Sequence, residues 1–225
     1  MNYLQMKLIS AAFLGFLTCA APAQNLTFER NFKVGDKTIV DVHVTVNSEM
    51  PVDSTSEVQT VVTKVYPDGS ADETVQVLSS KVKVMGQEHD VPTGAVTTIK
   101  ISKYGSTLGG GNSSMQMGDM SSYLSSFRDG LTVGKSVSFD TSAAKPPANR
   151  FKGTITLSSV VDGVGTLNSD MQIWSPAMGD TPMHSVVVEK IDTVTHQLIS
   201  STADVTGFPA DKKITSVHFE MTTKK

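Results

Sequence analysis

FKGTITLSSVVDGVGTLNSDMQIW, residues 151–174, consists of two runs of strand-forming residues on either side of Asp162-Gly163. An Asp-Gly pair between two such runs is typical of a β-hairpin, because glycine adopts backbone angles that residues with a Cβ avoid. Past residue 24, apolar residues also recur at every second position, which is the period of a strand with one wet face. The sequence therefore predicts a mainly β, antiparallel fold.

The same arrangement recurs elsewhere in the chain. Residues 58–66 and 71–84 flank Pro67-Asp68-Gly69-Ser70, in which proline and glycine favour the angles of a tight turn, so a second hairpin is expected there. Valines alternate with polar residues over residues 40–46, which predicts another half-buried strand. Further strands are predicted over residues 95–104, 183–191, 197–206 and 214–221.

The predicted strands fall into two halves with a similar order of elements. Val34–Asp41 aligns with Val133–Asp140 at an offset of 99 residues, and in both segments Val-Gly opens a strand that ends in an apolar residue followed by Asp. Each segment is followed by a hairpin and another strand, as expected of an internal repeat. We predict a single β-rich domain over residues 24–225, made of similar halves at about 26–105 and 131–225.

A Gly- and Ser-rich loop and one amphipathic helix are predicted between the halves, over about residues 106–130. The helix, at about 117–128, has Asp119 in its first turn and Gly130 after its end, both typical of helix termini. Its apolar stripe has spacings of three and four residues and consists of Met117, Met120, Leu124 and Phe127.

A helix that lies over a twisted sheet is the simplest way to bury such a stripe. The expected architecture is a curved antiparallel sheet, or two half-sheets that face each other, in the form of a half-barrel with the helix as a lid. Whether the halves share one sheet or form two is left open by the sequence.

The N-terminal residues have the features of a secretory signal peptide. Lys7 precedes an apolar run over residues 8–17, and Ala21-Pro22-Ala23 supplies the small residues of a cleavage site. We expect residues 1–23 to be removed by cleavage after Ala23 and the mature protein to be periplasmic or secreted. Because the only cysteine, Cys19, lies within this segment, no disulfide is expected in the mature chain.

The composition narrows the range of functions. With 19 basic and 22 acidic residues, the formal charge of -3 argues against a nucleic-acid binder held by phosphate contacts. Past the signal, no continuous apolar run reaches the ~18 residues that a spanning helix needs, so no transmembrane segment is expected in the mature chain. Hydrophobic residues make up 39% of the chain, which is typical of a folded protein.

Catalytic motifs are not found in the sequence. Gly130 and Gly134-Lys135-Ser136 resemble a phosphate-binding loop, but only three residues separate the glycines and a strand is expected to follow, where the motif needs a helix. The chain also contains no Gly-x-Ser-x-Gly elbow, and its histidines are not spaced as zinc ligands. We therefore expect a non-enzymatic protein without a cofactor.

The methionines carry the clearest chemical signal. Met115, Met117 and Met120 form a Met-x-Met-x-x-Met cluster, and thioether sulfurs are soft ligands that favour Cu(I). The other interpretation is that Met117 and Met120 begin the apolar stripe of the helix and pack against the sheet, since methionine commonly fills gaps in cores. Trp174, in a predicted loop, is a candidate for the rim of an apolar pocket.

The order of elements resembles the half-barrel proteins of the bacterial envelope, whose best-known member carries lipoproteins between membranes. The resemblance covers the signal, the strands that open at Val34-Gly35-Asp36, a helical plug near residues 119–127 and the later hairpins. The chain is also similar to exported bacterial β proteins with a Val-Gly-Asp strand opening and an Asp-x-x-Thr turn, here Asp192-Thr193-Val194-Thr195. The second resemblance implies a fold and no particular activity.

We therefore expect an exported envelope protein that binds an apolar ligand or a lipid-linked partner on the concave face of its sheet. The candidate binding residues are Met117, Met120, Leu124, Phe127 and Trp174. One alternative is a Met-rich periplasmic copper-binding protein with Met115, Met117 and Met120 as ligands. Another is a structural or assembly protein of the cell envelope that has no small-molecule ligand.

The lid hypothesis makes a direct prediction. Met120→Gln and Leu124→Gln should each weaken the binding of an apolar fluorescent dye, because each places a polar amide in the surface that would cover the ligand. Dye titration of the purified mature chain measures this, with far-ultraviolet circular dichroism to verify folding. Unchanged affinity in folded variants would rule out a lid at these positions.

Overall fold

The computed structural model describes residues 25–105, 107–110, 127, 129–141, 150–175, 178–179 and 181–224. Strands make up most of these residues, which also include a short 3-10 helix, η4 (Ala210–Lys212), and no α-helix. The predicted signal peptide lies outside the described residues, as does the predicted helix 117–128 except for Phe127. Both stay predictions from the sequence.

Fourteen strands are present in the described residues, and every strand pair is antiparallel. The prediction of a mainly β, antiparallel fold is therefore confirmed. The strands are β1 (Asn25–Leu26), β2 (Lys37–Ser48), β3 (Val52–Val65), β4 (Ala71–Val84), β5 (Gln87–Asp90), β6 (Val96–Ile101), β7 (Thr107–Gly110), β8 (Leu131–Thr132), β9 (Ser136–Asp140), β10 (Arg150–Val161), β11 (Val164–Trp174), β12 (Met183–Asp192), β13 (Leu198–Thr206) and β14 (Ile214–Thr223).

Twelve of these strands form one sheet, in the order β7-β6-β4-β3-β2-β14-β13-β12-β11-β10-β9, with β5 paired to β4. The short strands β1 and β8 pair with each other. Strands of both sequence halves thus share one sheet, because the C-terminal strand β14 pairs with β2. In the part of the chain that the structure describes, the sheet does not close on itself: β7 and β9 are its two ends.

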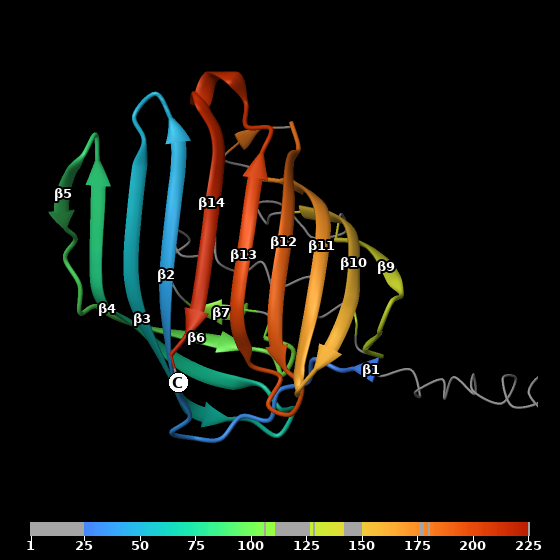
Figure 1. Cartoon of the computed structure of the whole chain (residues 1–225). Helices are drawn as coiled ribbons and strands as arrows, with labels where there is room; N and C mark the ends of the chain where they lie inside the picture. Colours follow the sequence, from blue (N-terminus) through green and yellow to red (C-terminus); the bar gives the residue numbers. More distant parts are fainter. Residues whose placement is uncertain are drawn as a thin grey trace, which may run out of the picture.

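The sheet is strongly curved at its β4 end. The lower parts of β3 and β4 turn behind the lower part of the sheet, so that β6 and β7 lie behind the lower parts of β14 and β13 (Figure 1). An extra residue in β4, Leu78, and another in β3, Thr63, interrupt the register of this pair. Such bulges bend a strand and increase its twist. β4 consequently pairs along one half with β5 and along the other with β6.

The main hydrophobic core lies on the inner face of β10 to β14. Along β11 and β12, buried inward residues alternate strictly with outward residues that are exposed or half-buried. The segments around β1 and β8 cover this face with Leu26, Phe28 and Leu131, all at most 3% exposed. Full burial of such a side chain stabilises the fold by about 1.5–3 kcal/mol. A second, smaller cluster of Val62, Ala71 and Ile101 lies in the curled part of the sheet.

The two aligned Val-Gly segments have the same local structure. Gly35 and Gly134 both lie in a turn with positive φ, at 91° and 78°, immediately before a strand. Their N–H groups donate to carbonyl oxygens of the second strand that follows, Gly35 to Val62 of β3 at 2.9 Å and Gly134 to Leu157 of β10 at 2.8 Å. The strands that follow have different places, since β2 lies in the middle of the sheet and β9 at its edge.

Gly153 in β10 lies directly against the backbone of β11. A Cβ at this position would lie 2.1 Å from the carbonyl oxygen of Asp170 and 2.6 Å from the Cα of Met171, both backbone atoms of β11. We predict that Gly153→Ala lowers the free energy of unfolding by at least about 2 kcal/mol, because the two backbones must separate. Urea denaturation followed by circular dichroism measures the loss.

Gly165→Ala is the matched control, since Gly165 also faces inward in this strand pair and is buried. Its added Cβ would meet the end of the Leu26 side chain at 2.7 Å, and a side-chain end can move away. A smaller loss is therefore expected. Equal losses for the two variants would contradict the backbone explanation.

Candidate functional site

The inner face of β2, β3 and β4 differs from the face that holds the main core. The inward residues of β11 and β12 are fully buried, whereas Val40, Val42, Val44 and Val46 of β2 are only half-buried. Their inward neighbours on β3 and β4 include Val58, Val75 and Val77, which are half-buried as well. We call this surface, the inward side of β2 to β4, the valine face.

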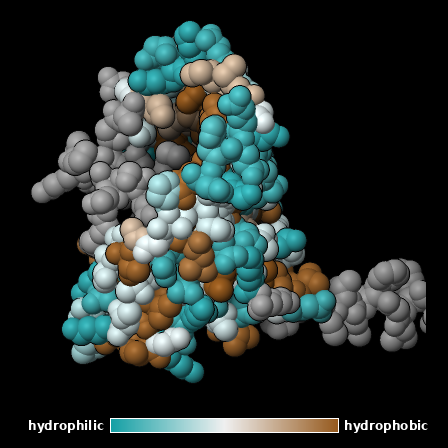
Figure 2. All heavy atoms as spheres, turned by 90° about the vertical axis from the view of Figure 1, so that its left-hand side faces the viewer, coloured by the Kyte–Doolittle hydropathy of each residue, from teal (hydrophilic) through white to brown (hydrophobic). Residues whose placement is uncertain are grey.

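The surface chemistry of the two sides of the sheet is unequal. Figure 2 views the molecule from the β5 side and shows hydrophilic residues over the outer side, with hydrophobic residues deeper in the upper part. A curved sheet with a half-buried apolar inner surface can accept an apolar molecule, because burial of further apolar area is favourable.

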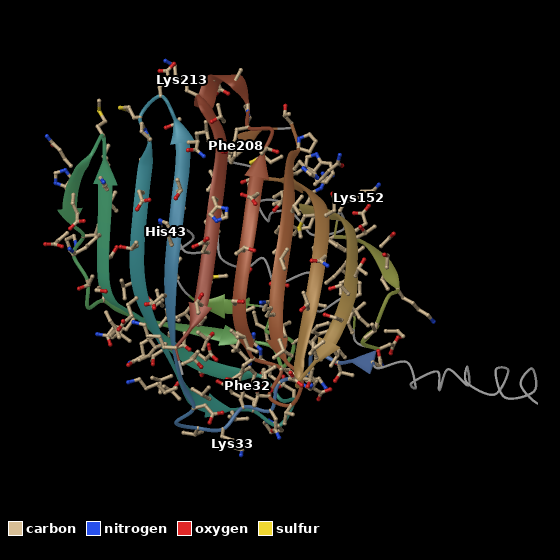
Figure 3. All side chains as sticks on the ribbon, in the orientation of Figure 1. Phe32, Lys33, His43, Lys152, Phe208 and Lys213 are labelled. Carbon is tan, nitrogen blue, oxygen red and sulfur yellow. The ribbon has the colours of Figure 1, made fainter. Side chains whose placement is uncertain are left out.

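A cavity of about 190 Å³ lies at the lower end of the valine face. Its floor is the inward side of β2, β3 and β4, and its walls come from the segment before β2, the β12–β13 turn and the end of β14. Figure 3 shows Phe32, which lines the cavity, at the lower end of the fold. The other lining residues are Arg30, Asn31, Asp36, Thr38, Val40, Thr60, Val62, Glu73, Thr195, Gln197, Leu198 and Thr223.

A backbone hydrogen bond and a contact with a neighbouring turn position Arg30. Its N–H donates to the carbonyl oxygen of Lys103 at 2.7 Å. A Cβ at Gly105 would lie 3.2 Å from the Cζ atom of Arg30, so the guanidinium packs directly on this glycine. Burial lowers the pKa of Arg30, although the carboxylates of Glu73 and Glu189 act to raise it. The cavity wall therefore carries a cation that is incompletely compensated.

Glu73 lies across the same cavity, on the inward side of β4. It is paired in register with Val62 of β3 and Ile99 of β6, so its carboxylate lies between two apolar side chains. Burial raises the pKa of Glu73, and the attraction of Arg30 lowers it by less. The cavity thus combines opposite charges with the hydroxyls of Thr38 and Thr60, which face each other across β2 and β3.

The outer face carries a row of histidines and carboxylates across four strands, which we call the histidine row. His43 Nε2 lies 3.0 Å from Asp53 Oδ2, and His43 Nδ1 lies 3.6 Å from Glu220 Oε2. His218 Nε2 lies 3.1 Å from Glu220 Oε1, and His218 Nδ1 lies 2.7 Å from Asp204 Oδ1. Figure 3 shows His43 on the side of the sheet that faces the viewer, away from the cavity.

The carboxylates of this row raise the pKa values of the two histidines. Hydrogen bonds to Asp53 and to Asp204 are the largest causes that raise the pKa of His43 and of His218, respectively, and Glu220 adds to both. Hydrogen bonding to His218 lowers the pKa of Glu220. Within the described residues, no three His, Cys, Asp or Glu side chains are grouped as metal ligands.

Most of the predicted binding residues lie outside the described residues: Met115, Met117, Met120 and Leu124. Phe127 is described and is 6% exposed within the main core, where its ring packs edge-on against Phe139 with centroids 5.9 Å apart. Trp174 ends β11 and is half-buried, and the guanidinium of Arg150 lies 5.2 Å from its ring centroid. Neither Phe127 nor Trp174 lines the cavity beside Arg30.

Arg30, Glu73 and the histidine row were not predicted from the sequence. For Glu73 a signal exists, since it interrupts the apolar alternation of Ala71, Val75 and Val77. Arg30 lies outside any strand and has no comparable signal. The histidine row becomes visible only when the register of β2 with β14 is known.

In the described residues, no helix is long and apolar enough to cross a membrane. No family model and no curated protein matches the sequence. Among solved structures, a protein described as exported and of YmcC-like fold, from Bacteroides fragilis NCTC 9343, aligns with 90% of this chain and 100% of its own, at 9% identity and a TM-score of 0.32. DynF, from the dynemicin biosynthesis pathway of Micromonospora chersina, aligns with 91% of this chain and 86% of its own, at 10% identity and a TM-score of 0.21. TM-scores of this size do not establish a common fold.

The histidine row predicts a pH-dependent contribution to stability. Because the pKa values of His43 and His218 lie above the ordinary 6.5, their contribution is full below pH 6.5 and is lost as the pH rises through the raised values. The pKa of Glu220 lies below the ordinary 4.5, so its contribution is present above pH 4.5 and is lost as the pH falls through the lowered value. The row should therefore stabilise the fold most between these two limits.

Glu220→Gln tests this contribution. We expect the substitution to lower the pKa of both histidines, measured by NMR titration of their ring protons, and to lower the melting temperature more at pH 6 than at pH 8. Glu49→Gln is the control. Glu49 is an exposed residue directly after the last residue of β2, and its carboxylate pairs with Lys213. Histidine pKa values that do not respond to Glu220→Gln would show that the row is not electrostatically coupled.

Proposed function

We propose that the protein is an exported, non-enzymatic binding protein that holds an apolar ligand or a lipid-linked partner on the inner face of its sheet. The observation that carries this proposal is the valine face, where apolar side chains on three adjacent strands are half-buried beside a fully packed core. Periplasmic or secreted localisation is part of the proposal and rests on the signal-like N-terminus.

The shape of the sheet supports the proposal. Bulges bend β3 and β4, and β6 and β7 lie behind the lower parts of β14 and β13 in the view of Figure 1. The valine face is therefore bounded on its lower side by the cavity beside Arg30 and on the β14 side by the main core. An elongated apolar molecule can lie along β2 between these boundaries and bury the half-exposed valines.

The copper-binding and structural alternatives stay predictions from the sequence. The methionines of the copper alternative lie outside the described residues, as do the lid residues Met117, Met120 and Leu124. The valine face favours the apolar ligand, because it is a surface in the described part of the chain that such a ligand would bury.

Val42→Asp tests the proposal on the valine face itself. Val42 is half-buried and points inward, so a carboxylate there would have to be desolvated by any apolar ligand that covers it. We expect the affinity for an apolar fluorescent dye to fall at least about tenfold, which corresponds to the ~1.4 kcal/mol of a modest desolvation penalty. Fluorescence titration of the mature chain measures this.

Thr45→Asp is the matched control. Thr45 is also β-branched and half-buried on β2, but it lies on the outer face, opposite His218. Dye affinity should be unchanged in this variant, and circular dichroism must show that both variants fold. Equal affinities for wild type, Val42→Asp and Thr45→Asp would overturn the proposal.

A further inference from the structure

We propose that the cavity beside Arg30 binds a small zwitterionic head group, whose anionic part accepts hydrogen bonds from Arg30 and whose ammonium part donates to Glu73. The inference rests on the proposed function, since an apolar part attached to such a head would lie along the valine face. It extends that function by naming the polar chemistry of the ligand.

The cationic side of the cavity is Arg30. A guanidinium carries five N–H donors and no acceptor. In the part of the chain that the structure describes, none of these donors has a hydrogen-bond acceptor and no carboxylate oxygen lies within 4.0 Å, and the half-buried side chain lines the cavity. Among the described residues only Ser185 Oγ is a fully buried side-chain polar atom without a partner, so donors of Arg30 that lack a protein acceptor remain accessible, and an anionic group in the cavity could form a charge-assisted pair with them.

The anionic side is Glu73. Its carboxylate belongs to the inward surface of β4 between Val62 and Ile99, and no described residue donates a hydrogen bond to it. A carboxylate accepts hydrogen bonds from several donors at once, and the half-buried carboxylate of Glu73 lines the cavity, where such donors can approach it. An ammonium group beside Glu73 would supply up to three donors and an opposite charge.

The charges around the cavity favour a zwitterion over a simple ion. An anion alone would satisfy Arg30 but would be repelled by Glu73, by Asp36 on the cavity wall and by Glu189, whose charge also acts on Arg30. A cation alone would satisfy Glu73 but would be repelled by Arg30 and would leave its donors unmet. A head group that contains both charges would pair with Arg30 and with Glu73 at the same time.

Size and hydrogen-bonding groups fit the same class of ligand. A protein cavity of roughly 150 Å³ holds a molecule of the size of benzene. The cavity here is about 190 Å³, which accommodates a head such as phosphoethanolamine. The hydroxyls of Thr38 and Thr60, directly opposite each other on the cavity floor, can donate to or accept from its remaining polar atoms.

Calorimetric titration of the mature full-length chain with O-phosphoethanolamine tests the inference. We expect saturable binding, and binding at least about tenfold weaker for ethanolamine alone and for methyl phosphate alone, because each lacks one charge-assisted hydrogen-bonding group. Equal affinity for either fragment, or no binding of O-phosphoethanolamine, would overturn the inference.

Variants test the two assigned contacts. Arg30→Gln and Glu73→Gln should each weaken O-phosphoethanolamine binding at least about tenfold. Lys33→Gln and Asp90→Asn, exposed positions of the same charge types, should leave it unchanged. Folding is verified by circular dichroism, and the fragment comparison needs no variant. Unaltered binding in folded Arg30→Gln or Glu73→Gln would contradict the assignment.

A short-chain lipid identifies the source of the head group. Dihexanoyl-phosphatidylethanolamine that binds more tightly than O-phosphoethanolamine and displaces the apolar dye indicates a lipid, whereas equal affinity without displacement indicates a free zwitterion. Dye binding without O-phosphoethanolamine binding would overturn this inference alone. Loss of dye binding only in Thr45→Asp, or in no variant, would instead overturn the proposed function.

Discussion

The pairing of β14 with β2 is the interaction on which the rest of the structure depends. It joins the last strand of the chain to the first long strand, and inward pairs such as Val44 with Phe219 and Val46 with Val217 continue the main core across this junction. Without it, β2 would be a sheet edge with unpaired backbone groups. The valine face would then lose the core that bounds it, and the histidine row, in which Glu220 faces His43, would be divided.

Local features of the sequence predicted the local features of the fold well. Asp162-Gly163 and residues 67–70 correctly located two hairpins, because turn residues and alternation act over a few positions. The aligned Val-Gly segments correctly indicated two similar turns, at Gly35 and Gly134. They did not indicate that one precedes a central strand and the other an edge strand, since strand order depends on pairings between distant residues.

The candidate site was harder to predict, because it depends on two polar residues that interrupt apolar patterns. Glu73 occupies an inward position of β4, and Glu189 occupies an inward position of β12 between Val187 and Ile191. Each interruption is visible in the sequence once the strand is assigned. That both act on Arg30, from strands five places apart in the sheet, follows only from the curvature of the sheet and the path of the segment before β2.

The division of the inner face into two parts explains how the fold can tolerate such a site. Inward residues of β10 to β13, among them Ile155, Leu157 and Leu167 at 0% exposure, form a core that supplies much of the stabilisation. Incompletely compensated charges such as Arg30 and Glu73 lower stability, and apolar side chains of similar volume would commonly serve a fold as well or better. The position of these charges beside the cavity at the lower end of the valine face is therefore consistent with the ligand binding that we propose, and it is not accounted for by stability.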